Sequence, residues 1–319
     1  MKRKVIQIAN STQLVSLPRA WAKLHGIKKG DELEIDESGG KLIINGPGQA
    51  TDQAAEIDAT GLDRTSIVLL LRGLYKKGYT QIKIICNNPV LPHYRTGEKR
   101  TFLNVVHSEV NRLPGMEVIQ QRENYCVIKA ISEPTPKDLD TVIRRVLLLI
   151  NDVSRDLIDA GKKFDKTLLE TVEEKHDTIT KFTSYCQRLL YKHPPEHQSS
   201  LMIIISLLDK ITDNIKNAAR LMIKNHKRIR PEALAIMEQV HLSSALYQKL
   251  HVKVDYGIIN ALSQTKEDVI EKLLENLTKI SREEAVIINT LQASLELYRG
   301  MVEVRVAMEV FKPFTPTAL

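Results

Sequence analysis

The stretch SLMIIISLLDKITDNIKNAARLMIKNH, residues 200–226, combines a long helical repeat with an unusual pair of acidic residues. Its apolar residues recur at steps of three and four, which places them on one face of an α-helix. Asp209 and Asp213 are one helical turn apart on the flank of that face, where like charges repel by roughly a few tenths of a kcal/mol. A cation bound between the two carboxylates would make this pair favourable. The alternative is a solvated helix face whose charge is compensated by neighbouring lysine and arginine side chains.

The surrounding sequence, from 135 to 312, predicts an all-α domain. Capping residues, glycines and prolines delimit six helices, at about 136–160, 165–191, 199–228, 231–262, from 265, and 281–311. Thr265 to Asp268 is expected to cap the fifth helix and Ser281 to Glu284 the sixth. The helices form two consecutive groups of three, which indicates a weak internal duplication. In this alignment Asp209 corresponds to Glu296, and Asp213 corresponds to Gly300.

Two three-helix groups with an acid-x-x-x-Asp motif on the third helix resemble the PhoU family of phosphate-uptake regulators. The resemblance implies a bundle of two three-helix repeats that binds metal in its first half. It assigns the ligands to Asp209 and Asp213, with further acidic side chains from the preceding helix, namely Glu170, Glu173, Glu174 and Asp177. Oxygen ligands with no facing histidine favour magnesium, manganese or iron over zinc. Because Gly300 cannot ligate a metal, we expect at most one such site.

The first domain, residues 1–48, is predicted to contain two strands, a short helix and two further strands. The helix follows Pro18 and stops at Gly26, and Gly30 turns the chain into the third strand. So few residues bury too little apolar area for a stable monomer, and we therefore expect this domain to dimerise.

Positive charge is concentrated at the start of this domain. Residues 1–30 contain seven lysine and arginine residues and no acidic residue, a segregation that predicts contact with phosphate groups. An ordinary basic surface is the alternative. The order Leu17-Pro18, Gly26-Ile27, Gly30-Asp31 and Leu33-Glu34-Ile35 resembles the swapped-hairpin DNA-binding domains of the AbrB/SpoVT type. That resemblance implies that two chains interlock their hairpins and grip double-stranded DNA through Lys2, Arg3, Lys4, Arg19 and Lys23.

A linker signal at 46–49 separates this domain from a small α/β domain at 54–133, predicted as β-α-β-α-β-β with a polar loop at 87–99. We find no phosphate-cradling glycine motif and no recognisable Ser/His/Asp set in it, so its role stays open and we expect no enzymatic activity. The sequence thus indicates a multidomain α+β chain.

The composition of the 319 residues limits the classes of protein. The net charge of +7 favours a polyanionic partner, and three widely separated cysteines exclude a disulfide framework and a zinc site. No apolar run reaches about 18 residues, and no apolar signal core follows the start. We therefore expect a cytoplasmic protein that is not embedded in a membrane.

Together the two resemblances predict a regulator of phosphate uptake that binds DNA through its N-terminal dimer. The helical half would report phosphate status by docking a phosphate transporter or a signalling protein, with a metal ion assisting. The alternative is an adaptor that does not bind DNA, uses the hairpin only to dimerise and inhibits a phosphate transporter or signalling partner directly through its bundle. Under either hypothesis we expect a homodimer or higher even oligomer. Gln13 and Leu14, which stand where many AbrB-type domains have Gly and a basic residue, favour the adaptor. A metal-dependent phosphatase is a third hypothesis, but it lacks convergent catalytic groups.

Overall fold

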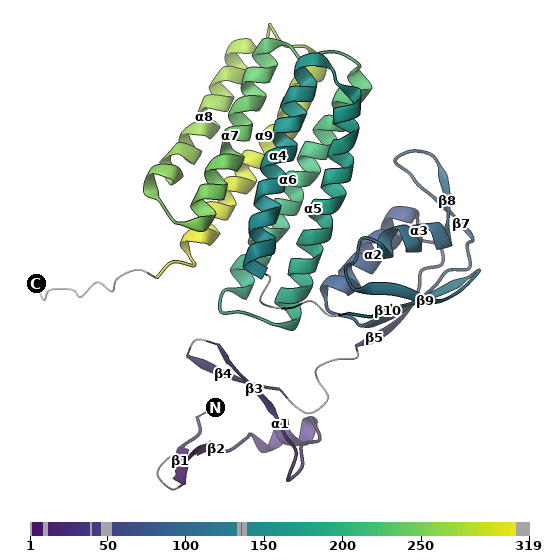
Figure 1. Cartoon of the computed structure of the whole chain (residues 1–319), viewed down its shortest axis with the longest axis vertical. Helices are drawn as coiled ribbons and strands as arrows, with labels where there is room; N and C mark the ends of the chain where they lie inside the picture. Colours follow the sequence, from purple (N-terminus) through teal and green to yellow (C-terminus); the bar gives the residue numbers. More distant parts are fainter. Residues whose placement is uncertain are drawn as a thin grey trace, which may run out of the picture. The chain divides into compact units, whose positions relative to one another are not determined.

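The computed structural model describes residues 2–8, 12–38, 40–45, 53–132, 135 and 139–310. The chain divides into two compact units, Met1–Gln53 and Ala54–Leu319 (Figure 1). The predicted linker at 46–49 lies outside the described residues.

The first unit has the element order that the sequence predicts. Two antiparallel hairpins flank a short helix, and they comprise β1 (Val5–Ile8), β2 (Thr12–Val15), α1 (Arg19–Leu24), β3 (Glu34–Ser38) and β4 (Lys41–Asn45). Gly26 follows α1 with φ +64°, and Gly30 precedes β3 with φ +97°. Both angles lie in the left-handed region that glycine adopts at little cost, which explains the two glycines.

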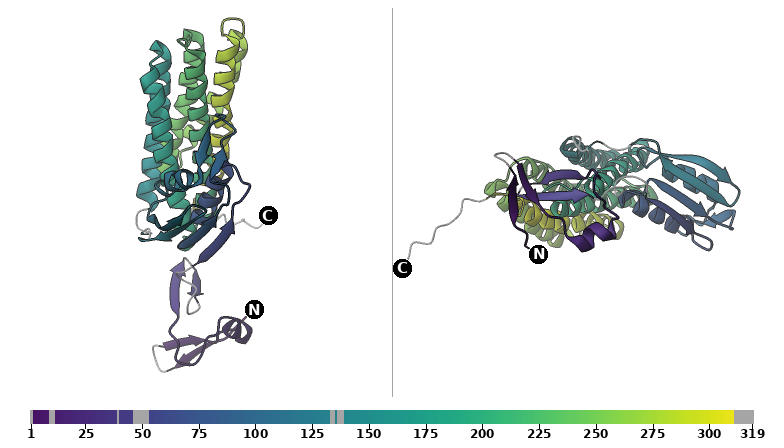
Figure 2. Two further views of the ribbon diagram at one scale, coloured as in Figure 1. Left: turned by 90° about the vertical axis from the view of Figure 1, so that its right-hand side faces the viewer. Right: turned by 90° about the horizontal axis from the view of Figure 1, so that it is seen from below.

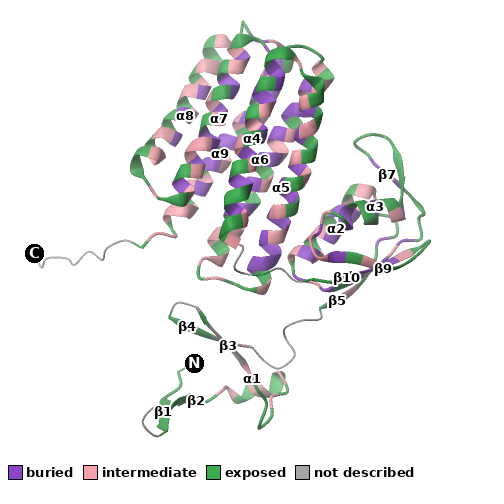
Figure 3. Ribbon diagram, in the orientation of Figure 1, coloured by how far each residue is buried: buried purple, intermediate pink, exposed green. Residues whose placement is uncertain are grey.

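Apolar side chains of the first unit are exposed to solvent within a single chain. Val5, Ile6 and Ile8 of β1 are 63%, 56% and 52% exposed, and α1 contains no buried residue (Figure 3). A two-stranded hairpin with an exposed apolar face is marginally stable in water. The unit therefore needs a further surface to cover these side chains.

The second unit begins with a four-stranded mixed sheet in the order β5-β6-β10-β9. β5 runs parallel to β6, and the other pairs are antiparallel. α2 and α3 pack on one face of the sheet over a core that includes Ile67, Ile82, Phe102 and Ile128. The elements are β5 (Ala54–Asp58), α2 (Arg64–Lys76), β6 (Gln81–Ile85), β7 (Val90–Pro92), β8 (Lys99–Thr101), α3 (Phe102–Val110), β9 (Met116–Arg122) and β10 (Tyr125–Ala130).

One expectation for this region is wrong, because the predicted polar loop at 87–99 contains a strand. β7 pairs with β8 as a small antiparallel hairpin. Leu91 of β7 is fully buried and joins the core beneath the sheet. The two apolar residues Val90 and Leu91 are too short a run to give a detectable period, so tertiary packing decides this element.

Six long helices follow within the described residues, and they lie alongside one another in each view (Figure 2). They are α4 (Leu139–Lys163), α5 (Lys166–Lys192), α6 (Gln198–Asn225), α7 (Pro231–Val252), α8 (Tyr256–Asn276) and α9 (Arg282–Val306). Ser281 and Glu284 form the predicted capping box at the start of α9. None of the helices in the described part of the chain has the length and apolar character needed to cross a bilayer.

The boundary between α7 and α8 corrects the predicted fourth and fifth helices. Helix α7 ends at Val252. The Asp255 side chain caps α8 by accepting a hydrogen bond from the Ile258 backbone N–H at 3.1 Å. Thr265, the predicted cap, is buried inside α8 and donates to the Ala261 carbonyl at 2.8 Å. Thr265 and Asp255 are both residue types that favour caps, and packing selects between them.

The helices share one continuous hydrophobic core rather than two separate ones. α6 packs against both α5 and α9, and α4 packs against α5 and α7. The predicted inner face of α6 is confirmed, since Ile204, Leu208, Ile211 and Met222 are each at most 1% exposed. Cys86, Cys126 and Cys186 are buried free thiols, in agreement with the absence of a disulfide framework.

Candidate functional site

The predicted DNA-contacting side chains are all exposed in the first unit. Lys2, Arg3 and Lys4 precede β1, and Arg19 and Lys23 lie on α1. Within the described residues, none of the five forms an ion pair with the protein. Asp31, the first acidic residue, accepts a hydrogen bond from the Lys28 backbone N–H at 2.7 Å. These cations are therefore available to a polyanion.

Asp213 on α6 is surrounded by cationic groups. Its Oδ1 lies 2.6 Å from Lys216 Nζ and 3.0 Å from His176 Nε2, and its Oδ2 lies 3.4 Å from Lys210 Nζ. Partial burial opposes ionisation of Asp213, but the hydrogen bonds from His176 and Lys216 outweigh it and hold the pKa of this carboxyl well below its usual range.

His176 on α5 was missed in the sequence, where no histidine was expected to face the aspartates. Its side chain is 8% exposed, with Nδ1 3.0 Å from Asp177 Oδ1 and Nε2 3.0 Å from Asp213 Oδ1. The imidazole therefore lies between two carboxylates on adjacent helices. The spacing of Val172, His176 and Ile179 on the buried face of α5 was the available signal, because it gives this histidine an inward position.

Asp209 lies one turn before Asp213 and meets a different partner. Its Oδ1 accepts a hydrogen bond from Thr183 Oγ1 of α5 at 3.1 Å. Its negative charge also acts on Lys76 of α2, whose pKa is lowered mainly by burial. The two aspartates thus face side chains from two other helices, α5 and α2.

Charged residues of α2 and α3 meet this acidic face. Arg72 Nε of α2 lies 2.5 Å from Glu109 Oε1 of α3, and Glu109 is fully buried. Arg112, two residues after α3, lies with Nη1 3.9 Å from Glu109 Oε2 and donates from Nη2 to Asp177 Oδ1 of α5 at 2.5 Å. We call this chain of contacts the charge network, and it comprises Arg72, Glu109, Arg112, Asp177, His176, Asp213 and Lys216.

We call the four-stranded sheet together with α2 and α3 the sheet layer. Arg188 provides a second connection between the sheet layer and the long helices. This side chain of α5 is 1% exposed and donates from Nη1 to the carbonyls of Tyr75 and Tyr79, both at 2.9 Å. Its guanidinium also lies over the Tyr75 ring, 4.9 Å from the centroid. Tyr75 belongs to the last turn of α2, and its carbonyl also accepts a hydrogen bond from the Gly78 backbone N–H at 3.0 Å. Arg188 therefore binds both the end of α2 and the segment that follows it.

The other predicted metal donors are not brought to Asp209 and Asp213. Glu170 pairs with Lys166 in its own helix, and Glu173 pairs with Arg220 of α6. No group of three or more His, Cys, Asp or Glu side chains in the described residues is placed to hold a metal ion. Metal binding at Asp209, Asp213 and the other predicted donors, Glu174 included, therefore stays a prediction.

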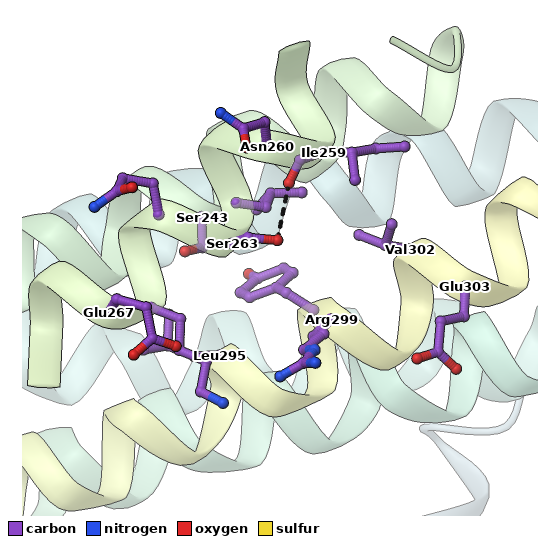
Figure 4. Close-up of a pocket in the computed structure, with 13 residues that line it drawn as sticks. Ser243, Ile259, Asn260, Ser263, Glu267, Leu295, Arg299, Val302 and Glu303 are labelled. Carbon is purple, nitrogen blue, oxygen red and sulfur yellow. Dashed lines mark hydrogen bonds between the residues drawn. The ribbon is translucent and has the colours of Figure 1, made fainter. Parts of the chain in front are cut away.

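The second half of the bundle carries a pocket of about 380 Å³ between α7, α8 and α9 (Figure 4). Leu295 and Val302 give it an apolar wall, and Arg299 and Glu303 line it with opposite charges. Glu296, the counterpart of Asp209, forms an ion pair with Lys266 of α8 at 2.6 Å. The counterpart of Asp209 is therefore paired with a lysine, and a Cβ on Gly300, the counterpart of Asp213, would lie 3.8 Å from the Leu207 side chain of α6.

Residues 6–49 match a known family, described as antidote-toxin recognition MazE, a bacterial antitoxin. The match covers the first compact unit and none of the second. No curated protein matches the chain. The N-terminal unit is thus similar to MazE/AbrB-type antitoxin domains.

Proposed function

We propose that this protein is a DNA-binding regulator of phosphate uptake whose N-terminal units dimerise on double-stranded DNA. The observation that carries the DNA-binding part is the MazE-like segment with its exposed and unpaired basic side chains. Exposed apolar residues on β1 support dimerisation, because a second copy would cover them. Lysine and arginine side chains from both copies would then contact the phosphate backbone.

The phosphate-uptake part of the proposal concerns the helices of the second unit. Six helices in two consecutive groups of three support a PhoU-like bundle of two repeats, as does the correspondence of Asp209 with Glu296. In this proposal the bundle reports phosphate status by docking a transporter or a signalling protein. The experiment for it is co-purification of the full chain with the phosphate transporter of its own cell, compared in phosphate-rich and phosphate-starved cultures.

Binding of labelled duplex DNA at several salt concentrations tests the DNA-binding part. We expect Lys2→Gln, Arg3→Gln and Arg19→Gln together to weaken binding by roughly tenfold or more and to flatten the salt dependence. The matched control replaces three exposed basic residues of the helical part by glutamine, namely Lys227, Arg228 and Arg282. An unchanged salt slope in the N-terminal triple variant would refute DNA binding through this unit.

A second candidate is recognition of a protein instead of DNA, as an antitoxin or an adaptor. The name of the matching family, which refers to toxin recognition, favours it. In that case DNA binding would be at background in the wild type and in the triple variant alike. The distinguishing measurement is capture of a protein partner by the full chain, lost when the apolar face of β1 is altered.

A further inference from the structure

The carboxylates that the sequence assigns to a metal ion already have protein partners. Asp177 binds Arg112, Asp213 binds Lys216, and Asp209 accepts a hydrogen bond from Thr183. Each carboxylate oxygen has a limited number of lone pairs, and each donor uses one of them. These contacts therefore occupy positions that a hard metal ion would need.

The local charge balance also opposes a metal ion. Four cationic side chains, Arg72, Arg112, Lys210 and Lys216, form ion pairs with three of the four carboxylates, namely Glu109, Asp177 and Asp213. A divalent cation entering this cluster would meet carboxylates whose charge is already largely compensated. Its electrostatic attraction to the aspartates would be correspondingly weak.

We propose that the charge network is an internal latch, which holds α2 and α3 against α5 and α6 in place of a metal ion. Arg112 crosses from the sheet layer to α5, and His176 continues the contact from Asp177 to Asp213 on α6. A metal ion and the latch would use the same carboxylates. This acidic face is therefore an internal docking surface for the chain's own α2 and α3.

The latch bears on the attachment of the N-terminal unit. β5 begins at Ala54, and the first compact unit ends at Gln53, so the sheet layer is the part to which that unit is joined. Contacts that hold the sheet layer to the helices therefore hold β5 in place within the second unit.

Charge reversal in the full-length protein tests the latch. We compare Arg112→Asp, Asp177→Arg and their combination, with amide hydrogen exchange measured by mass spectrometry across α2 and α3. Each single variant is expected to raise exchange there by roughly fivefold or more, and the combination to exchange clearly less than either single variant. Recovery is partial because Arg112→Asp also removes the contact with buried Glu109. The control is Arg144→Asp, which breaks the exposed pair with Asp140 inside α4.

Unchanged exchange in both single variants would overturn the proposal. If the single variants fail to fold, the combined variant decides: recovery of the wild-type circular dichroism spectrum supports the latch, and failure to recover contradicts it.

Metal analysis gives an independent test. The wild-type protein is equilibrated with Mn²⁺ or Fe²⁺, dialysed, and its metal content is measured by mass spectrometry. We expect well below one equivalent per chain for the wild type. A metal content of roughly one equivalent in the wild type, lost in the double variant Asp209→Asn with Asp213→Asn, would establish a metal site. It would refute the proposal that the latch takes the place of a metal ion. The outcome is independent of whether the N-terminal unit binds DNA.

Discussion

His176 on α5 and Asp213 on α6 face each other, with the imidazole Nε2 3.0 Å from the carboxylate Oδ1. This contact joins the two helices beneath the sheet layer. Asp213 also forms an ion pair with Lys216, so its ionised form is stabilised by two partners in the folded protein. In the unfolded chain neither partner is held in place, and the carboxyl returns to its ordinary pKa of about 3.8.

The depressed pKa of Asp213 predicts a pH-dependent contribution to stability. A carboxyl whose pKa is lower in the folded state stabilises the fold above its unfolded pKa, and this contribution is lost as the pH falls through the folded value. Because Asp213 is 32% exposed, solvent screening limits the effect to about 1 kcal/mol. We expect Asp213→Asn to lower the free energy of unfolding by that amount at pH 7 and at pH 5.

Urea denaturation across the pH range checks this prediction. The difference between wild type and Asp213→Asn should shrink below about pH 4, as the unfolded wild-type carboxyl binds a proton. Asp140→Asn, in an exposed pair on α4, is the control and should have little effect at any pH. A difference that grows as the pH falls would contradict the assigned contacts.

Substitution of Arg188 is expected to destabilise the contact between the sheet layer and the helices. Arg188→Met removes the donor to the carbonyls of Tyr75 and Tyr79 but keeps most of the side-chain volume. The Tyr75 carbonyl keeps its hydrogen bond from the Gly78 N–H, whereas the Tyr79 carbonyl loses the Arg188 donor. A buried carbonyl left without a donor costs about 1–3 kcal/mol, so we expect a loss of that size in the free energy of unfolding. Arg188→Lys should be intermediate, because an ammonium group lacks the planar geometry that stacks on Tyr75.

The sequence predicts most elements of the fold because their signals are local. The inner face of α6 follows from its period, and Ser281 with Glu284 marks the start of α9. The charge network could not be predicted in the same way. Arg112 and Asp177 are far apart in sequence, and their contact depends on how α3 docks against α5. Local patterns identify the aspartates but do not identify the cations that reach them.

Substitution of two glycines by alanine is expected to change the free energy of unfolding in opposite directions. Gly115 has φ +80°, and a Cβ there would lie 2.3 Å from the Ser132 carbonyl oxygen. Gly73 lies in α2, and a Cβ added to it meets no atom within 4 Å. We expect Gly115→Ala to lower the free energy of unfolding by roughly 2 kcal/mol or more, and Gly73→Ala to raise it by about 0.5–1 kcal/mol. Thermal denaturation of the two variants would test both signs, and equal shifts would contradict the backbone geometry.

A charge on the apolar face of β1 is expected to prevent dimerisation. Ile6 is 56% exposed in the single chain, although an isoleucine gains about 1.5–3 kcal/mol when it is buried. In a dimer that covers this face, Ile6→Glu would bury an unpaired carboxylate, so the variant should be monomeric at micromolar concentration and should lose DNA binding. Light scattering coupled to size-exclusion chromatography measures the mass directly. Leu274→Glu, on the exposed surface of α8, is the matched control because its side chain is 64% exposed. A dimeric Ile6→Glu protein would show that the chains associate through another surface.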